Sequence, residues 1–183
     1  MRLTQSTKWA LVLTSALIAA ACSSSSPATT PDGSDAGVSC PSGTCCAYQV
    51  PSGTDLTSAT SFAHDIQPIF INSCVFSGCH NDSTGMGAAH VFLGSRSTPA
   101  GNSQVFADIV GTASTELPSM DYVKAGDLAN SYLLHKIDGD QCLFNAMCGG
   151  ASCGVSMPNG VALLDVATRD KLRRWIAEGA QNN

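Results

Sequence analysis

The pattern of hydrophobic and polar positions predicts helices in the C-terminal two thirds of the chain. In the segment SFAHDIQPIFINSC the apolar positions recur at helical spacing, and they are Phe62, Ile66, Ile69 and Phe70. Asp65 is the expected N-cap of this helix. It would place Pro68 in the first turn, where the missing N–H of proline has no intrahelical partner to lose. We expect this short helix to lead directly into Cys74.

Three later segments have the same helical character. The segment SQVFADIVG suits a short helix, and in GDLANSYLLHKIDGD Asp127 can cap a helix that ends at Gly139. In LDVATRDKLRRWIAEGA, Asp165 is the expected N-cap, and Gly179 should end the helix. The buried stripe of this last helix should contain Leu172, Trp175 and Ile176. No segment shows the sustained alternation of a strand, so the predicted fold class is mainly α, with long loops.

The N-terminus has the pattern of an export signal. Arg2 and Lys8 precede the apolar run WALVLTSALIAAA, which is shorter than the roughly 20 residues that a membrane-spanning helix needs. Small residues stand directly before Cys22, and this arrangement resembles a bacterial lipoprotein signal. The resemblance implies that residues 1–21 are removed and that Cys22 is the lipidation site; cleavage nearby without lipidation is the alternative.

Composition then divides the rest of the chain. Residues 23–37 are all Ser, Pro, Ala, Thr, Asp or Gly, which cannot bury enough apolar surface to offset the entropy of ordering. We therefore expect residues 22–60 to be a Ser/Thr/Pro-rich tether that contains a cysteine cluster, and residues 61–183 to be one small folded domain. The protein should be exported and anchored in a membrane through Cys22, in the periplasm or at the outer membrane.

The charge of the chain is acidic. Its formal net charge is −5, and removal of Arg2 and Lys8 with the signal makes it about −7, which argues against a nucleic-acid partner. Four of the remaining basic residues lie close together in one predicted helix: Arg169, Lys171, Arg173 and Arg174. We interpret this group as a solvated helix face, and a docking patch for an acidic partner is the alternative.

The cysteines predict a disulfide framework. The chain has nine, and apart from Cys22 and the pair Cys74 and Cys79 they form two clusters of three. One cluster comprises Cys40, Cys45 and Cys46, and the other comprises Cys142, Cys148 and Cys153. Because each cluster holds an odd number, complete pairing in an oxidising compartment requires at least one disulfide between the clusters.

The stretch SCVFSGCHN holds the candidate chemistry. Cys74, Cys79 and His80 are arranged as C-x4-C-H, whereas covalent haem attachment normally uses C-x2-C-H. Residues three apart on a helix share a face and residues five apart do not, so the two extra residues must be looped out. Ser77 and Gly78 suit such a loop, because glycine tolerates backbone angles closed to other residues. A disulfide between the two cysteines also requires a departure from helix.

The order of motifs along residues 61–180 resembles that of c-type cytochrome domains in bacterial exported and lipid-anchored proteins. The segments are FAHDIQPIF, the C-x4-C-H motif, MDYVKAGDLANSYLLHKI, SMPNG and LRRWIAEGA. The resemblance implies a cytochrome c-like fold that binds haem c through thioether bonds to Cys74 and Cys79. It also implies that His80 and Met157 are the two ligands of the haem iron. The function would be electron transfer to and from a redox partner protein that the sequence does not identify, without catalysis on a substrate.

Two other interpretations remain open at this level. One is a haem-free, disulfide-stapled surface lipoprotein that keeps a cytochrome-like fold and acts in interaction or structure. The other is a copper or zinc site formed by Cys and His, which would need reduced thiols in an oxidising compartment. The weaker candidates for ligands are Met86, Met120 and Met147, together with His64, His90 and His135, for which we expect core or solvent-exposed positions.

Overall fold

The computed structural model describes residues 48–82, 90–150 and 152–183, and in this part helices and loops are joined by isolated β-bridges, without a strand. The predicted mainly α fold class is confirmed to that extent. None of the described helices has the length and apolar character needed to cross a membrane. The predicted signal 1–21, the lipidation residue Cys22 and the cysteines of 40–46 lie outside the described residues.

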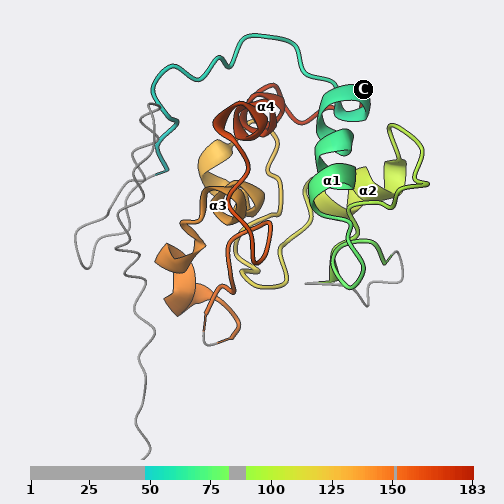
Figure 1. Cartoon of the computed structure of the whole chain (residues 1–183). Helices are drawn as coiled ribbons and strands as arrows, with labels where there is room; N and C mark the ends of the chain where they lie inside the picture. The colour runs from blue at the N-terminus through green and yellow to red at the C-terminus, as the bar shows by residue number, and fades with distance from the viewer. Residues whose placement is uncertain (1–47, 83–89, 151) are drawn as a thin grey trace, which may run out of the picture. The chain divides into compact units, whose positions relative to one another are not determined.

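The four predicted helices are all present (Figure 1). The elements, in chain order, are the π-helical turn η1 Phe62–Ile66, α1 Gln67–Ser73, α2 Ser103–Ile109, the 3-10 turn η3 Leu128–Asn130, α3 Tyr132–Asp138, the 3-10 turn η4 Gln141–Met147, and α4 Val166–Ala177. As predicted, α1 ends one residue before Cys74 and therefore delivers the chain into the motif.

The start of the first helix corrects one prediction. Its N-cap is Ser61 rather than Asp65: the Ser61 hydroxyl accepts a hydrogen bond from the backbone N–H of His64. The Asp65 carboxylate instead accepts from the backbone N–H of Ser61, at 2.9 Å, so the two side chains satisfy donors reciprocally. Because the helix starts earlier, Pro68 follows the π-helical turn, and it lies in the first turn of α1.

The helix predicted from Asp127 to Gly139 is divided in two. Asp127 caps η3 by accepting from the backbone N–H of Asn130, whereas α3 begins after Ser131, which makes no side-chain cap bond. As predicted, α3 ends at Gly139, whose φ of +79° is the left-handed conformation that glycine favours. The Asp165 carboxylate accepts from the backbone N–H of Thr168 at 2.9 Å and so starts α4. Local capping rules therefore account for the end of α3 and the start of α4.

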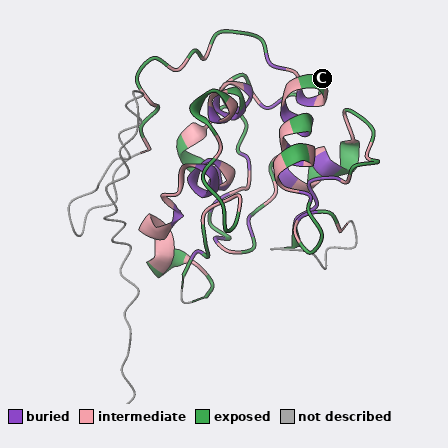
Figure 2. Cartoon of the chain, viewed as in Figure 1, coloured by how far each residue is buried: buried purple, intermediate pink, exposed green. Residues whose placement is uncertain are grey.

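The core forms where the first helix, α2 and α4 pack together. The rings of Phe62 and Trp175 stack with centroids 5.5 Å apart, and the Phe106 ring meets Phe62 edge-on at 5.4 Å. The buried Trp175 places its indole N–H 2.9 Å from the carbonyl oxygen of Gln181, so its one polar group is satisfied. Figure 2 shows buried residues concentrated in α3, α4 and one side of the first helix.

The basic stretch of α4 is only partly the solvated face that the sequence suggested: Lys171 is exposed, but two of the arginines are not. Arg169 and Arg173 are buried, and both pair with the carboxylate of Asp138 at the end of α3; the Arg169 bond is 2.8 Å long. Tyr48 joins this network, because its hydroxyl donates to Asp138 and accepts from Nε of Arg173. The charges are buried because an acidic partner from another helix neutralises them, and they tie α3 to α4.

Residues 48–60, which composition assigned to the tether, contact the folded domain through α4. The Thr54 hydroxyl donates to Asp170, and Nε of Arg174 donates to the hydroxyl of Thr60. The backbone N–H of Thr60 donates to the carboxylate of Glu178. The part of the chain that packs on the domain therefore extends back at least to Tyr48.

Candidate functional site

The motif loop folds back on itself directly after α1. The backbone N–H of Cys79 donates to the carbonyl of Phe76 at 2.9 Å, which closes a four-residue turn with Ser77 and Gly78 in the middle. Gly78 has a φ of +78°, the conformation that this turn position requires and that glycine adopts freely. The backbone N–H of His80 then donates to the carbonyl of Cys74 at 3.2 Å. The two extra residues are looped out, as predicted.

His80 is held from both sides. Its backbone carbonyl accepts from the N–H of Leu93 at 2.9 Å, and its ring Nδ1 lies 3.2 Å from the carbonyl oxygen of Val91. The residue is buried, with 7% of its surface exposed. A histidine that donates from Nδ1 to a backbone carbonyl presents Nε2 as its metal-binding nitrogen. The segment 91–93 thus orients the imidazole in the way that a ligand histidine requires.

The two thiols of the motif are not joined by a disulfide, and both are partly buried. Burial, with a smaller contribution from the neighbouring Cys79, raises the pKa of the Cys74 thiol to about 12. At neutral pH this group is a neutral thiol. It therefore lacks the thiolate character of an activated cysteine nucleophile.

Met157 lies in the loop between η4 and α4. Its backbone N–H donates to the carbonyl of Lys136 in α3 at 2.8 Å, and its peptide bond to Pro158 is cis. Of the other methionines, Met120 is buried in a separate cluster with Leu117, Met147 is exposed, and Met86 is outside the described residues. Met157 is the methionine that the fold carries to the motif.

A single cavity brings together all four residues that the sequence singled out: Cys74, Cys79, His80 and Met157. Its volume is about 240 Å³. Most of its walls are apolar, and they include Ile69, Phe70, Val91, Leu93, Ile109, Leu133, Ile137, Leu164 and Leu172. An apolar cavity with two thiols, an imidazole and a thioether fits a covalently bound haem with His and Met as ligands.

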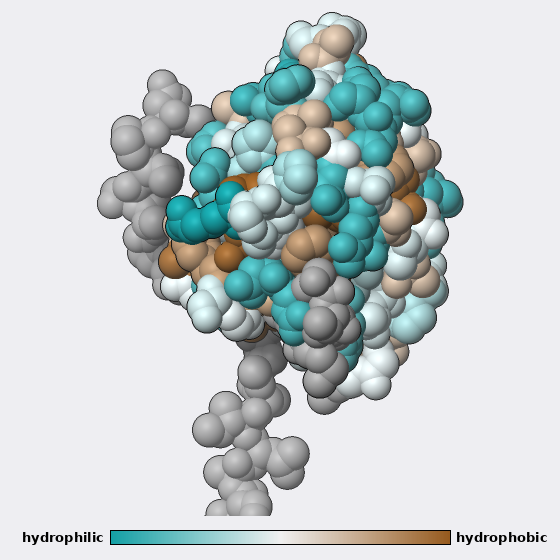
Figure 3. Space-filling model, turned by 90° about the vertical axis from the view of Figure 1, so that its right-hand side faces the viewer, coloured by the Kyte–Doolittle hydropathy of each residue, from teal (hydrophilic) through white to brown (hydrophobic). Residues whose placement is uncertain are grey.

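The mouth of this cavity is apolar as well. Phe76 and Val161 line the cavity, yet 51% and 67% of their surfaces are exposed. On the face of the molecule that Figure 3 shows, hydrophobic residues lie in separate areas among hydrophilic ones. The apolar side chains at the mouth would limit the contact of a bound group with water.

One corner of the cavity is polar, and sequence reasoning missed it. The carboxylate of Glu116 accepts from Nζ of Lys136 and from the hydroxyl of Tyr132, both at 2.8 Å. Nζ of Lys136 also donates to the carbonyl of Cys153, and the Tyr132 hydroxyl oxygen lies near the same carbonyl oxygen, each at 3.0 Å. Burial, and then the bond to Glu116, raise the pKa of Tyr132. Lys136 lies four residues after Tyr132, so the two side chains share the apolar face of the predicted helix. A lysine on that face was the one sequence feature that could have indicated a buried ion pair here.

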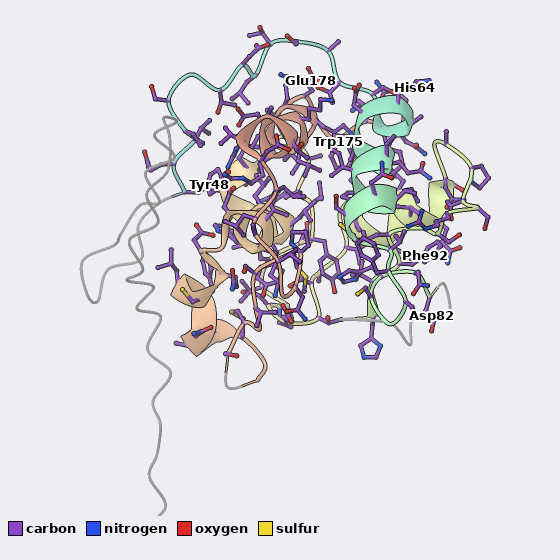
Figure 4. The ribbon with its side chains drawn as sticks, in the orientation of Figure 1. Tyr48, His64, Asp82, Phe92, Trp175 and Glu178 are labelled. Atoms are coloured by element: carbon purple, nitrogen blue, oxygen red, sulfur yellow. A yellow bond between two sulfur atoms is a disulfide. The ribbon has the colours of Figure 1, made fainter. Side chains whose placement is uncertain are left out.

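The remaining histidines occupy the positions that we expected. His64 and His90 are exposed, and His64 lies at the opposite end of the first helix from Asp82, which follows the motif (Figure 4). His135 is buried; its Nδ1 lies 2.8 Å from the Asp140 carboxylate, and its Nε2 lies 3.2 Å from the carbonyl of Ala129. None of these three histidines is among the residues that line the cavity.

One disulfide is present among the described residues, between Cys148 and Cys153 within the C-terminal cluster. The predicted bond between the two clusters involves residues 40–46, which lie outside the described part, and it stays a prediction. The described part of the chain holds no group of three or more His, Cys, Asp or Glu side chains arranged for a metal ion. In comparisons with known proteins, no family model, curated protein or solved structure matches this chain.

Proposed function

We propose that this chain is a single-haem c-type cytochrome that transfers electrons outside the cytoplasm. The observation that carries the proposal is the shared cavity, which gathers Cys74, Cys79, His80 and Met157 from two segments far apart in the sequence. Three of these residues come from the loop after α1, and Met157 comes from the loop before α4. The donor set is the one that the sequence resemblance implies for haem c.

Each residue would have a distinct role. Cys74 and Cys79 would hold the haem through thioether bonds, and His80 and Met157 would be the ligands of its iron. The haem would supply the one-electron redox chemistry when bound. The protein orients His80 through the carbonyl of Val91, and it excludes water with the apolar walls of the cavity. Ligation by His and Met raises the reduction potential relative to other ligand sets.

An electron carrier suits this cavity better than an enzyme does. The polar side chains in its wall include Glu116, Tyr132 and Lys136, which bind one another and the carbonyl of Cys153 rather than point at a reacting centre. The Cys74 thiol is neutral at physiological pH because its pKa is about 12. We therefore propose a role in electron transfer without catalysis on a substrate.

The cellular setting follows from the N-terminal sequence. The signal-like residues 1–21 and Cys22 support export and attachment to a membrane by lipid, in the periplasm or at the outer membrane. The partner would be another redox protein, since the acidic net charge argues against nucleic acid. The haem-free surface lipoprotein is the alternative; it has less support, because Cys74 and Cys79 are unbonded thiols that line the same apolar cavity as His80 and Met157.

Expression of the full chain with a haem-ligation system tests this proposal. We expect a red protein that keeps its haem under denaturing conditions and has a reduced visible spectrum of the c type. A variant with both Cys74→Ala and Cys79→Ala should fold but lose the covalent haem, which separates specific attachment from adsorption. A colourless wild-type protein, obtained at full folded yield, would overturn the proposal in favour of the haem-free alternative.

A further inference from the structure

We propose that Glu116 is a positioning residue for Met157, acting through its ion pair with Lys136. The proposal rests on the proposed function only in so far as Met157 is a haem ligand. Glu116 lies outside every motif that the sequence singled out, in the segment that precedes η3. The residue between them is Lys136: Glu116 binds the side chain of Lys136, and the backbone carbonyl of Lys136 accepts from the N–H of Met157.

Lys136 holds the Met157 loop at two points. Its backbone carbonyl accepts from the N–H of Met157 at 2.8 Å, and its Nζ donates to the carbonyl of Cys153 at 3.0 Å. The two contacts lie on either side of residues 154–156. Cys153 is held as well by its disulfide to Cys148 and by the side chain of Asn145, which accepts from its backbone N–H at 2.8 Å. A shift of the Lys136 side chain would therefore loosen the start of this short segment by removing the bond from Nζ to the carbonyl of Cys153.

Glu116 keeps the Lys136 side chain in place. The Lys136 side chain is 8% exposed, and the Glu116 carboxylate 2.8 Å from its Nζ is the counter-ion that makes this burial tolerable. The backbone of Glu116 contributes as well, since its carbonyl accepts from the N–H of Gly149 at 3.0 Å. The ion pair and this backbone bond fix both ends of the segment that the Cys148–Cys153 disulfide closes.

The packing at Gly154 shows how closely the loop lies on the ion pair. A Cβ atom on this residue would be 2.7 Å from a carboxylate oxygen of Glu116 and 3.2 Å from Nζ of Lys136, and its φ is +66°. Glycine is the residue that lets the backbone approach this closely. The backbone of the loop at Gly154 is thus in direct contact with both charged groups.

The decisive variant is Glu116→Gln, which keeps the size of the side chain and removes its charge. A buried ammonium without a counter-ion moves toward water, so Nζ of Lys136 should leave the carbonyl of Cys153. In the haem-free full chain, hydrogen exchange at the Met157 amide, followed by NMR, should become at least about tenfold faster. The matched control is Glu178→Gln, which removes a carboxylate at the end of α4, where it accepts from Thr60.

The haem-loaded protein supplies the second readout. Oxidised Glu116→Gln should keep its covalent haem but show a weaker absorption band from the bond between methionine sulfur and iron, while Glu178→Gln keeps the wild-type band. Glu116→Asp, which restores the charge, should recover part of it. Unchanged exchange at Met157 in Glu116→Gln would overturn the proposal, and so would faster exchange with a fully retained band.

Two safeguards keep the test informative. If Glu116→Gln does not fold, Lys136→Met removes the same clamp without leaving an unpaired cation, and it should accelerate exchange at Met157 in the same way. If wild-type protein carries no haem, the proposed function fails, but the exchange experiment on the haem-free chain still decides whether Glu116 fixes the Met157 loop. The failures of the two proposals are therefore distinguishable.

Discussion

The turn inside the motif offers a quantitative test of how C-x4-C-H can act as a haem motif. Gly78→Ala places a side chain at a φ of +78°, where an L-residue costs about 1–2 kcal/mol relative to glycine. An added Cβ would meet no described atom within 4 Å, so the whole effect is backbone strain rather than a clash. A strain of this size changes the population of the turn by roughly 5–30-fold.

The chain can relieve this strain by breaking the hydrogen bond that closes the turn. Opening the hydrogen bond from Cys79 to Phe76 would separate Cys79 and His80 from Cys74, whose carbonyl now accepts from the N–H of His80. We therefore expect Gly78→Ala to lower the yield of covalent haem several-fold in cells with a haem-ligation system. The yield is measured as haem absorbance per amount of folded protein. The midpoint temperature of thermal unfolding of the haem-free chain should also fall by a few degrees.

A second turn in the same chain provides the control. Gly126 occupies the same position in the turn Lys124 to Asp127, which is closed by a hydrogen bond of 2.9 Å; its φ is +76°, and an added Cβ would again meet no described atom within 4 Å. Gly126→Ala should cost the same stability and leave haem attachment unchanged. If the two variants lose haem equally, the effect reflects global stability, and the argument for a specific turn is refuted.

Three further predictions concern other parts of the site and fold. Met157→Ala should leave the haem attached but lower the reduction potential and open the iron to small ligands, whereas Met120→Ala should do neither, as visible spectra and redox titration would show. Because the local disulfide removes two cysteines of the C-terminal cluster, non-reducing peptide mapping should find Cys142 linked to a cysteine of residues 40–46, and recovery of local pairs alone would contradict this. Burial lowers the pKa of His135, but bonds to a carboxylate and a carbonyl raise it overall above 6.5, so its stabilising contribution should be complete below about pH 6.5 and lost as pH rises through the folded pKa. The free energy of unfolding, measured with urea across this pH range, should fall as pH rises in the wild type and should depend less on pH in His135→Gln.

Short-range rules predicted the helices well because they depend on residues close in sequence. Asp127 and Asp165 cap the elements that follow them, and Gly139 ends α3, since each forms its bond within one helical turn. The error at the first helix has the same origin. Ser61 and Asp65 are both residue types that favour the N-cap position, and they lie four residues apart. The sequence alone does not show that Ser61 is the cap and that the Asp65 carboxylate accepts from the backbone N–H of Ser61.

Long-range pairing explains what the sequence could not reveal. Arg169 and Arg173 have the spacing of a solvated face, and only the position of Asp138 at the end of another helix turns them into buried ion pairs. The cavity's polar corner was missed for the same reason, because Glu116 and Lys136 meet only after the chain has folded. Charged residues are visible in a sequence, but their partners are not.

The two sides of the candidate site are therefore held by different kinds of contact. The turn that joins Cys74 to His80 is closed by backbone hydrogen bonds within the motif, and the segment 91–93 then holds His80, whereas Met157 depends on Lys136 and Glu116 from more distant parts of the chain. Local contacts form earlier in folding than contacts between distant segments, because less chain entropy is lost in closing them. We expect the motif loop to be formed while the Met157 loop is still open. Such an order would leave both thiols accessible for haem attachment before the methionine closes the cavity over them.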